Sequence, residues 1–351
     1  MKCDVYYVPV VGSDLEARCS ALEKLLSEIT PFLAYKKDEL VAVKLTIGDS
    51  TCVYHIPPEL VKRVVAKIKN QKAKPFLFDT SVIYKGSRQN AVDHLTLVQN
   101  KGFHYTKVGA PFIVADGVLG QDGKEYEINS KNIIRVKIPS FVGMLDSLLV
   151  LSHATGHVFP GYAGAIKNVA MGMSCRPTKQ VQHSSLKPSV IQENCTACGC
   201  CIPICPVDAI AFNEKGKAEI NPKICIGCGE CLCACKFDAI YVNWEEDVDI
   251  FCARMVDVAK FILSKFKNKF FITFAFDITQ ECDCISTKDD KIVSRNIGIL
   301  ASQDIVSLDQ AVADLLSDEY NFFKEHDAYK NMFRYAQTMG LGNLDYHLIK
   351  L

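Results

Sequence analysis

Short apolar runs alternate with amphipathic segments along the first third of the chain. The apolar runs cover residues 4–10, 41–45 and 75–78, and the amphipathic segments cover residues 14–29 and 57–69. The second amphipathic segment opens on two prolines, which fit the first turn of a helix. Strands that alternate with helices of this length predict a parallel sheet with crossover helices.

The same alternation returns later in the chain. Residues 147–151 are the clearest buried strand, and residues 270–276 and 297–300 read as two further strands. Helices are expected over about 247–266 and from about Leu308. Because strands resume in the last third, we expect it to complete one mixed, largely parallel α/β sheet begun by the first part. Separate domains along the chain are the alternative.

Three segments add detail to this map. Residues 84–94 lead into a helix, and residues 107–137 hold short β-like runs with two Asp-Gly turns, which predicts a small antiparallel excursion. Residues 320–339 are amphipathic with an aromatic stripe. We interpret that stripe as core or as a contact in a homo-oligomer.

A double cysteine motif interrupts these elements. The run Cys195-x-x-Cys198-x-x-Cys201-x-x-x-Cys205 repeats 30 residues later as Cys225-x-x-Cys228-x-x-Cys231-x-x-x-Cys235. This spacing is typical of two-cluster ferredoxins, in which the fourth cysteine of each run ligates the other cluster. We therefore expect two 4Fe-4S clusters, one held by Cys195, Cys198, Cys201 and Cys235, the other by Cys225, Cys228, Cys231 and Cys205.

The motif defines an expected insertion, called the cassette below, over residues 189–246. It is predicted to be an α+β ferredoxin domain of the bacterial type. Residues 1–188 would then be the first part of the α/β domain and residues 247–351 its completing part. Both halves of the cassette end in Asp-Ala-Ile, at Asp208 and Asp238, so we expect them to fold as one unit.

Other interpretations of the cysteines are weaker. One CxxC pair alone would suit zinc or a redox dithiol, but eight cysteines in this double register favour clusters. A disulfide scaffold is disfavoured in a chain of 351 residues, which is long enough for a large core. Cys200 and Cys233 are extra thiols within the cassette, and we interpret them as small apolar fillers rather than ligands.

Polar residues stand at or near the carboxyl ends of predicted strands, where open α/β sheets bind ligands. Lys44 and Asp79 are cofactor-binding candidates, although Lys44 also fits an amine that snorkels from a strand edge and Asp79 a helix N-cap. Asp277 is a catalytic candidate. Cys282-x-Cys284 could bind a metal or cap the active site, and a turn with incidental thiols is the plainer interpretation.

A glycine-rich loop follows the clearest strand. Its glycines can bring the backbone close to a ligand, while a histidine and a lysine place a base and an amine beside it. His157 and Lys167 are therefore catalytic candidates, and Gly161, Gly164 and Asn168 are cofactor-binding candidates. The alternatives are a satisfied histidine at a loop hinge and a lysine that contacts phosphate or carboxylate.

The composition limits the classes of binding partner that the sequence indicates. Lys plus Arg and Asp plus Glu both number 40, so no basic surplus indicates nucleic acid or an anionic membrane. No run has the apolar length of a membrane span, and the first residues lack a signal-peptide pattern. The 17 cysteines suit a reducing compartment, so we expect a cytoplasmic protein.

Across nearly its full length the sequence resembles the family called domain of unknown function 362, in its ferredoxin-containing form, whose reaction is unsettled. The segments that carry the resemblance are Lys44, Asp79-Thr80, residues 84–90, residues 164–168, Lys179 to His183, residues 282–284 and residues 298–304.

The stretch from His157 to His183 is also similar to the part of the lactate racemase family that holds a nickel-pincer nucleotide. That resemblance implies an acid/base role for His157, a cofactor tether at Lys167 and a nickel ligand at His183, with His94 as partner acid/base. It places a further cofactor or metal near Lys167 and His183. A related pocket reused for another cofactor or substrate is the alternative.

Three functions remain open. The leading hypothesis is an oxidoreductase, in which two clusters relay electrons between an external carrier, a protein or a small redox molecule, and an unknown small substrate near His157, Lys167, His183 and Asp277. A non-enzymatic electron carrier or subunit is the second. The third is a racemase or isomerase with a metal or pincer-type cofactor at Lys167 and His183.

Overall fold

The computed structural model describes most of the chain. The described residues are 2–10, 12, 14–84, 86–157, 159–183, 187–205, 207–225, 230–241, 248–317 and 320–351.

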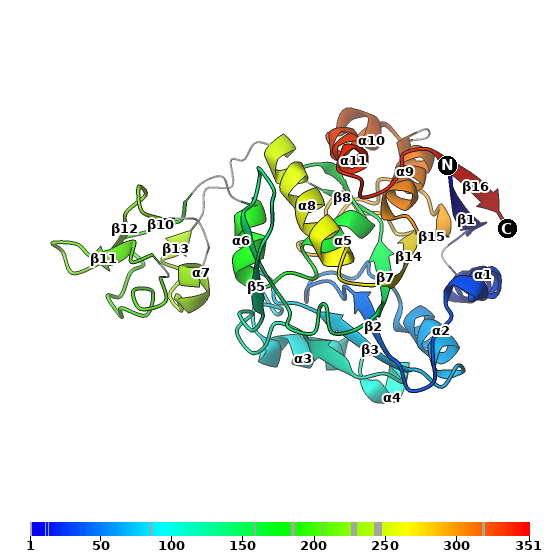
Figure 1. The fold of residues 1–351 in the computed structure, drawn as a ribbon, viewed down its shortest axis with the longest axis horizontal. Helices are drawn as coiled ribbons and strands as arrows, with labels where there is room; N and C mark the ends of the chain where they lie inside the picture. The colour runs from blue at the N-terminus through cyan, green and yellow to red at the C-terminus, as the bar shows by residue number, and fades with distance from the viewer. Residues whose placement is uncertain are drawn as a thin grey trace.

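An eight-stranded mixed sheet forms the centre of the described part (Figure 1), in the order β16-β1-β15-β14-β7-β2-β3-β4. Neighbouring strands are parallel except where β15 meets β1 and β14. The expected mixed, largely parallel α/β sheet is therefore confirmed. The strands are β1 (Cys3–Pro9), β2 (Leu40–Leu45), β3 (Lys74–Asp79), β4 (Phe112–Val114), β7 (Ser147–His153), β14 (Asn268–Ala275), β15 (Gly298–Ser302) and β16 (Tyr346–Lys350).

Helices cover both faces of the sheet, which is why the central strands are buried on both faces and mostly apolar. Every residue of β7 is buried. One face packs against α1 (Leu15–Glu28), α2 (Pro58–Lys69), α3 (Ala91–Asn100) and α4 (Tyr105–Val108), and η1 (Thr30–Phe32) follows α1. The other face packs against α5 (Ala165–Ala170), α8 (Val248–Leu263), α9 (Ile305–Ser317), α10 (Asn321–Glu325) and α11 (Tyr329–Thr338).

Local capping starts the early helices where the sequence predicts them. The Asp14 carboxylate accepts from Glu16 N and Ala17 N at 3.3 and 3.2 Å, and Pro58 stands in the first turn of α2. These contacts satisfy amide groups that have no partner within the helix.

Smaller elements complete the α/β part. β5 (Lys124–Glu127) and β6 (Arg135–Ile138) pair antiparallel, which confirms the predicted excursion. β4 lies in the same segment but joins the main sheet parallel to β3. β8 (Thr155–His157) and β9 (Gly161–Ala163) pair antiparallel around the glycine-rich loop, and α6 (Arg176–His183) follows.

Residues 320–351 differ in part from the expectation. The amphipathic segment 320–339 forms two short helices, α10 and α11, and its Phe323, Tyr329 and Phe333 side chains are buried. The core interpretation is confirmed, and the oligomer contact stays a prediction. The edge strand β16 was not predicted, because its half-exposed residues give no buried run.

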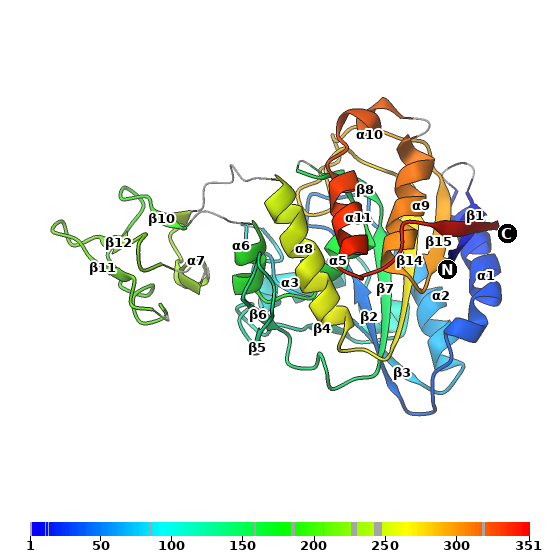
Figure 2. The same cartoon turned by 45° about the horizontal axis from the view of Figure 1, so that its top comes forward.

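The described part of the cassette has a small core of its own, separate from the two layers that cover the main sheet. It lies to one side of the α/β part, with α7 beside α6 in both Figure 1 and Figure 2. Its elements are β10 (Ser189–Val190) paired with β13 (Ile240–Tyr241), β11 (Ile210–Phe212) paired with β12 (Ala218–Ile220), and α7 (Glu230–Ala234).

The sequence repeat within the cassette is also a structural repeat. Asp208 and Asp238 both adopt the left-handed conformation, with φ of 52° and 50°. One residue later in each half, an alanine amide donates to a cysteine sulfur, Ala209 N to Cys205 Sγ at 3.2 Å and Ala239 N to Cys235 Sγ at 3.4 Å. The two halves therefore aim the same backbone donor at their last cysteine.

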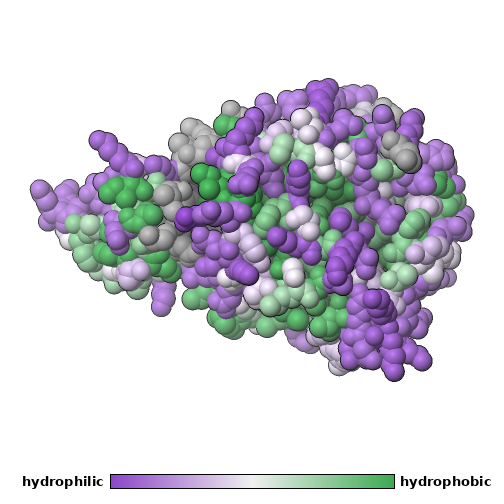
Figure 3. Space-filling view, in the orientation of Figure 1, coloured by the Kyte–Doolittle hydropathy of each residue, from purple (hydrophilic) through white to green (hydrophobic). Residues whose placement is uncertain are grey.

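Hydrophilic and apolar side chains are interspersed on the surface in the view of Figure 3, and apolar side chains are present on the cassette. Phe212 and Phe237 are 49% and 45% exposed there. Cys200 is exposed, and the side chain of Cys233 lies outside the described residues. Within the described ranges, no helix has the length and apolarity needed to cross a membrane.

Candidate functional site

A cavity of about 390 Å³ lies at the carboxyl ends of β2, β3 and β7. This volume is within the range of small-molecule sites, which cluster at this edge of α/β sheets. The ionisable side chains that line it are Lys44, Asp79, Tyr84, Arg88, His153, His157, Lys167, Lys179, His183, Cys282, Asp283 and Cys284.

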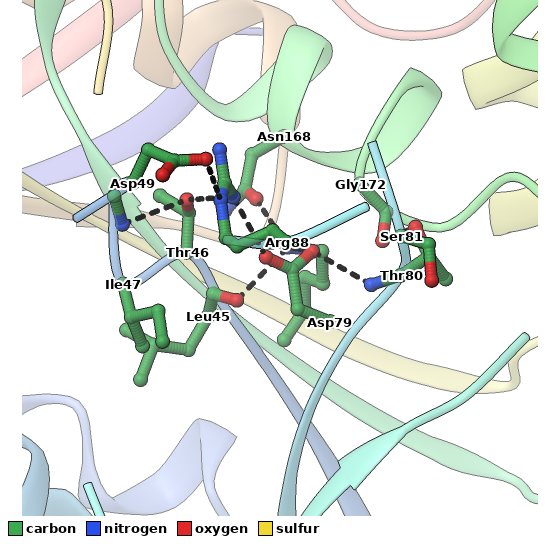
Figure 4. Close-up of polar contacts among 12 residues, drawn as sticks. Leu45, Thr46, Ile47, Asp49, Asp79, Thr80, Ser81, Arg88, Asn168 and Gly172 are labelled. Atoms are coloured by element: carbon green, nitrogen blue, oxygen red, sulfur yellow. Dashed lines mark hydrogen bonds and ion pairs between the residues drawn. The ribbon is translucent and has the colours of Figure 1, made fainter. Parts of the chain in front are cut away.

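Asp79 lies between two cationic side chains in one wall of the cavity (Figure 4). Its carboxylate pairs with Lys44 Nζ at 3.0 Å and with Arg88 Nη1 at 3.2 Å, and all three residues are buried. Lys44 Nζ also donates to Asn168 Oδ1 at 2.8 Å. Burial alone would raise the pKa of Asp79, but the two cations outweigh burial and hold that pKa at about 2. Asp79 is therefore ionised, and it neutralises part of the cationic wall.

The predicted loop residues are positioned by α9, which packs on the same face of the sheet as α5. Asp309 of α9 accepts from Ala165 N and Ile166 N, both at 2.8 Å, at the start of α5. A side chain at Gly164 would clash, because a Cβ there would lie 2.4 Å from Asp309 Oδ1. This contact fixes the first turn of α5, which carries Lys167 and Asn168 into the cavity.

Cys282, Asp283 and Cys284 form a tight turn at the cavity wall. Ile285 N and Ser286 N both donate to Cys282 O at 3.0 Å, and Asp49 N donates to Asp283 O at 3.0 Å. The turn is therefore held by backbone hydrogen bonds, and both thiols line the cavity.

The two thiols are in different electrostatic surroundings. Cys282 and Cys284 are hydrogen-bonded to each other, and Lys167 contacts Cys282. Tyr84 and Arg88 contact Cys284. The hydrogen bond between the two thiols, aided by the charges of Lys167 and Arg88, lowers the pKa of Cys284 well below its usual range, whereas that hydrogen bond and burial raise the pKa of Cys282. These directions favour the thiolate at Cys284 and the thiol at Cys282.

Three histidines line the cavity, and their pKa values are shifted in opposite directions. His153 Nδ1 lies 2.8 Å from Asp283 Oδ1 and its Nε2 lies 2.7 Å from Phe276 O, so both nitrogens face acceptors. Burial opposes the charge, but these acceptors raise the pKa of His153. Burial lowers the pKa of His183 to about 3 and holds that of His157 well below its usual value. Phe159 N donates to His157 Nδ1 at 3.1 Å, which leaves the proton on Nε2.

Lys179 reaches the cavity from α6. Its Nζ donates to Thr80 O at 3.3 Å and to Ser81 O at 2.5 Å. Burial lowers the pKa of Lys179 to about 8, although Asp116 and Asp79 oppose that shift. With Lys167, it supplies positive charge that Asp79 does not neutralise by direct contact.

Three predicted residues do not line the cavity. Asp277 forms a bidentate ion pair with Arg18, at 2.6 and 2.8 Å. His94 is fully buried against Phe112, and burial lowers its pKa to about 3. Gly161 lies against the backbone of the segment before α11.

The other predicted residues meet at this cavity. Lys44, Asp79, His157, Gly164, Lys167, Asn168 and His183 all line it.

No site role was predicted for Arg88, Lys179, His153 or Asp283. The thiols at residues 282–284 were interpreted as incidental to a turn. Their place in the sequence could have indicated such a role. The turn at residues 282–284 follows β14 and Arg88 follows β3, so both segments leave the sheet at the edge where α/β sheets bind ligands.

The cassette has a smaller pocket. It is lined by Cys195, Cys198, Cys201 and Cys235, together with Cys200 and apolar residues. Of the other expected ligands, Cys205, Cys225 and Cys231 are described, and Cys228 lies outside the described residues. Among the described residues, no three His, Cys, Asp or Glu side chains form a group that could hold a metal ion.

Comparison with known proteins identifies the family. The model of domain of unknown function 362, DUF362, matches residues 41–314, which is more than three quarters of the chain. The chain belongs to the DUF362 family. The match spans the cavity residues from Lys44 to Cys284. No curated protein matches this DUF362 chain.

Two solved structures are similar to this DUF362 protein. The lactate racemase apoprotein from Thermoanaerobacterium thermosaccharolyticum is 11% identical with a TM-score of 0.41, and the match covers 79% of this chain and 51% of the racemase. A structural-genomics protein from Thermotoga maritima is 10% identical with a TM-score of 0.44, over 91% of this chain and 59% of that protein. The chain thus spans about half to six tenths of these structures.

Proposed function

We propose that this chain is an iron-sulfur redox enzyme, whose cassette binds two 4Fe-4S clusters and whose cavity binds a small anionic substrate. When bound, the clusters would supply single-electron transfer. The observation that carries the proposal is the cassette pocket lined by Cys195, Cys198, Cys201 and Cys235. It combines three cysteines of the first run with the last cysteine of the second, which is the crossed ligand set of two-cluster ferredoxins.

The donors in that pocket fit a cluster. Cys201 lies close enough to Cys195, Cys198 and Cys235 for their charges to raise its pKa, in addition to the effect of burial. Ala218 N and Ala239 N donate to Cys195 Sγ and Cys235 Sγ, both at 3.4 Å, and such N–H groups stabilise thiolate charge. A cube spreads its thiolates over four iron atoms, so they stand farther apart than the ligands of a single ion.

The second ligand set follows the same pattern where it is described. Ala209 N donates to Cys205 Sγ, as Ala239 N does to Cys235 Sγ. Cys225, Cys228 and Cys231 complete the proposed set. The proposed domain division, with the cassette at residues 189–246 between the two parts of the α/β domain, follows from this assignment.

The cassette lies beside a wall of the cavity. Helix α6 carries Lys179 and His183, which line the cavity, and it packs beside α7 of the cassette, which carries Cys231 (Figures 1 and 2). One helix therefore stands between a proposed cluster ligand and the substrate cavity. This arrangement supports electron delivery to the cavity.

The charge of the cavity supports an anionic substrate. Asp79 neutralises much of the charge of Lys44 and Arg88, whereas the Lys179 ammonium group donates to the backbone carbonyls of Thr80 and Ser81. A carboxylate or similar anion would replace water at such buried cations. For the electron partner we propose a protein or small redox carrier, which would meet the cassette near the exposed Phe212 and Phe237.

Two matched serine variants test the clusters. Cys195→Ser should lose about four of about eight irons per chain in anaerobically purified protein, because one cluster loses a ligand. Cys200→Ser should keep all of them, because Cys200 shares the pocket but not the ligand set. Equal iron content in the two variants would contradict the ligand assignment.

The rival functions predict other results. For an enzyme, His157→Ala and Lys167→Ala should abolish substrate turnover at unchanged iron content, since both side chains line the cavity. For a non-enzymatic carrier, both variants should behave as wild type. A racemase or isomerase with a metal or pincer-type cofactor at Lys167 and His183 would turn over substrate without consuming reductant, which a reductant-to-product ratio measures.

A further inference from the structure

We propose that Cys282 and Cys284 form a dithiol-disulfide couple in the cavity, with Cys284 as the attacking thiolate and a small anionic disulfide as the substrate class. This inference deepens the proposed function and rests on it, because the couple names the substrate that the redox enzyme would reduce.

The contacts of the two sulfurs support a couple. They lie two residues apart in a turn, line the same cavity and are hydrogen-bonded to each other. Tyr84 and Arg88 contact Cys284, and Lys167 contacts Cys282. Reactive cysteines occur in such cationic surroundings within a cleft, whereas structural cysteines are buried among apolar groups.

The same contacts disfavour a metal site at the pair. A soft cation bound by two thiolates would lie next to the charges of Lys167 and Arg88, which already stabilise those sulfurs. No third donor joins them within the described residues. Thiolate chemistry is therefore favoured over metal ligation.

The protonation of the pair assigns the two roles. Arg88 and Tyr84 contact Cys284, where the guanidinium and the phenol stabilise a thiolate, and the lowered pKa of Cys284 and the raised pKa of Cys282 agree with a proton on Cys282. The thiolate is the species that attacks a disulfide. Cys284 therefore attacks first, and Cys282 resolves the mixed disulfide.

The reaction balances as thiol-disulfide exchange. Cys284 Sγ attacks one sulfur of the substrate, the substrate S–S bond breaks, and the first thiolate leaves. Cys282 then loses its proton and attacks Cys284 Sγ, which releases the second thiolate and forms the Cys282–Cys284 disulfide. Two electrons have passed to the substrate. An electron donor of the proposed function, or an added dithiol, returns two electrons and one proton to restore the pair.

The wild-type chain allows a direct redox titration. Trypsin releases residues 270–288, which hold both cysteines, and residues 19–24, which hold Cys19 alone. The full chain is equilibrated with mixtures of reduced and oxidised dithiothreitol, quenched with acid, alkylated and digested. We expect the 270–288 peptide to pass reversibly from two alkyl groups to none, with loss of two hydrogens, and the 19–24 peptide to stay alkylated.

Serine variants then trap the intermediate. Cys282→Ser should accumulate a mixed disulfide on Cys284 with dithiodiglycolate, a small dianionic disulfide, whereas Cys284→Ser should not. The neutral bis(hydroxyethyl) disulfide should react about tenfold more slowly, because the cationic cavity concentrates anions.

Three results would overturn the proposal. The 270–288 peptide could stay reduced at every ratio of reduced to oxidised dithiothreitol, or its alkylation could be blocked until a chelator removes a metal. The mixed disulfide could also be absent from both Cys282→Ser and Cys284→Ser, or form equally in both. These assays use added thiols and need no iron, so they succeed or fail independently of the iron content that tests the proposed function.

Discussion

Removal of the Asp79 carboxylate should destabilise the fold far more than removal of an exposed carboxylate. Asp79 is 2% exposed and pairs with two buried cations, at 3.0 Å from Lys44 and 3.2 Å from Arg88. Asp79→Asn keeps the side-chain shape but leaves both cations without their counter-charge. Breaking a buried pair in this way costs about 3–5 kcal/mol of unfolding free energy.

The pKa of Asp79 gives a second route to the magnitude. The folded pKa is about 2 and the unfolded value about 3.8, a depression that corresponds to about 2 kcal/mol. Because the folded pKa is depressed, this stability is fully present above about pH 4 and is lost as the pH falls through about 2. The difference between wild type and Asp79→Asn should therefore shrink in that acid window.

Urea unfolding followed by far-ultraviolet circular dichroism measures the effect, since most helix and strand lies in the α/β part. At neutral pH the Asp79→Asn midpoint should fall by about 1 M or more. Asp38→Asn is the matched control, because Asp38 pairs with Lys74 at 2.9 Å with both side chains more than half exposed. It should cost under about 1 kcal/mol. Equal midpoints for the two variants would refute the reasoning.

Three further predictions use other contacts. In a variant with serine at both Cys282 and Cys284, binding of dithiodiglycolate should weaken as the pH rises through about 8, where Lys179 loses its proton. With Lys179→Met added, binding should be weak at every pH. A pH step that persists in that variant would contradict the assignment of the step to Lys179. Arg18→Ala should lower unfolding free energy by about 1–3 kcal/mol, without changing disulfide trapping, because its partner Asp277 does not line the cavity; lost trapping would return Asp277 to the site. Gly172→Ala should lower the urea midpoint, because its Cβ would lie 2.3 Å from Lys44 Cε. An unchanged midpoint would contradict this prediction and show that the Lys44 side chain moves aside without cost.

The sequence predicts the elements that have strong local patterns. The apolar runs of β2, β3, β7 and β14 and the helices between them follow from residues close together in the chain. Lys44 and Asp79 could be found because they stand at strand ends, and parallel strands bring those ends to one edge. The edge strand β16 lacks a buried run and was not recognised.

Long-range partners could not be predicted in the same way. Asp277 stands next to a strand end like Asp79, but Arg18 from the first helix pairs with it outside the cavity. In the sequence alone Cys282 and Cys284 are typical of incidental thiols. In the fold, Lys167, Arg88 and Tyr84 contact them from other segments of the chain. No local pattern in the sequence encodes those contacts, because they depend on how the crossovers pack.

Metal analysis of the anaerobically purified full chain tests the central proposal most directly. The account predicts about eight irons per chain, as two four-iron clusters require, without stoichiometric nickel or zinc. Markedly fewer irons would contradict the cluster assignment, and stoichiometric nickel would instead support a metal cofactor at Lys167 and His183.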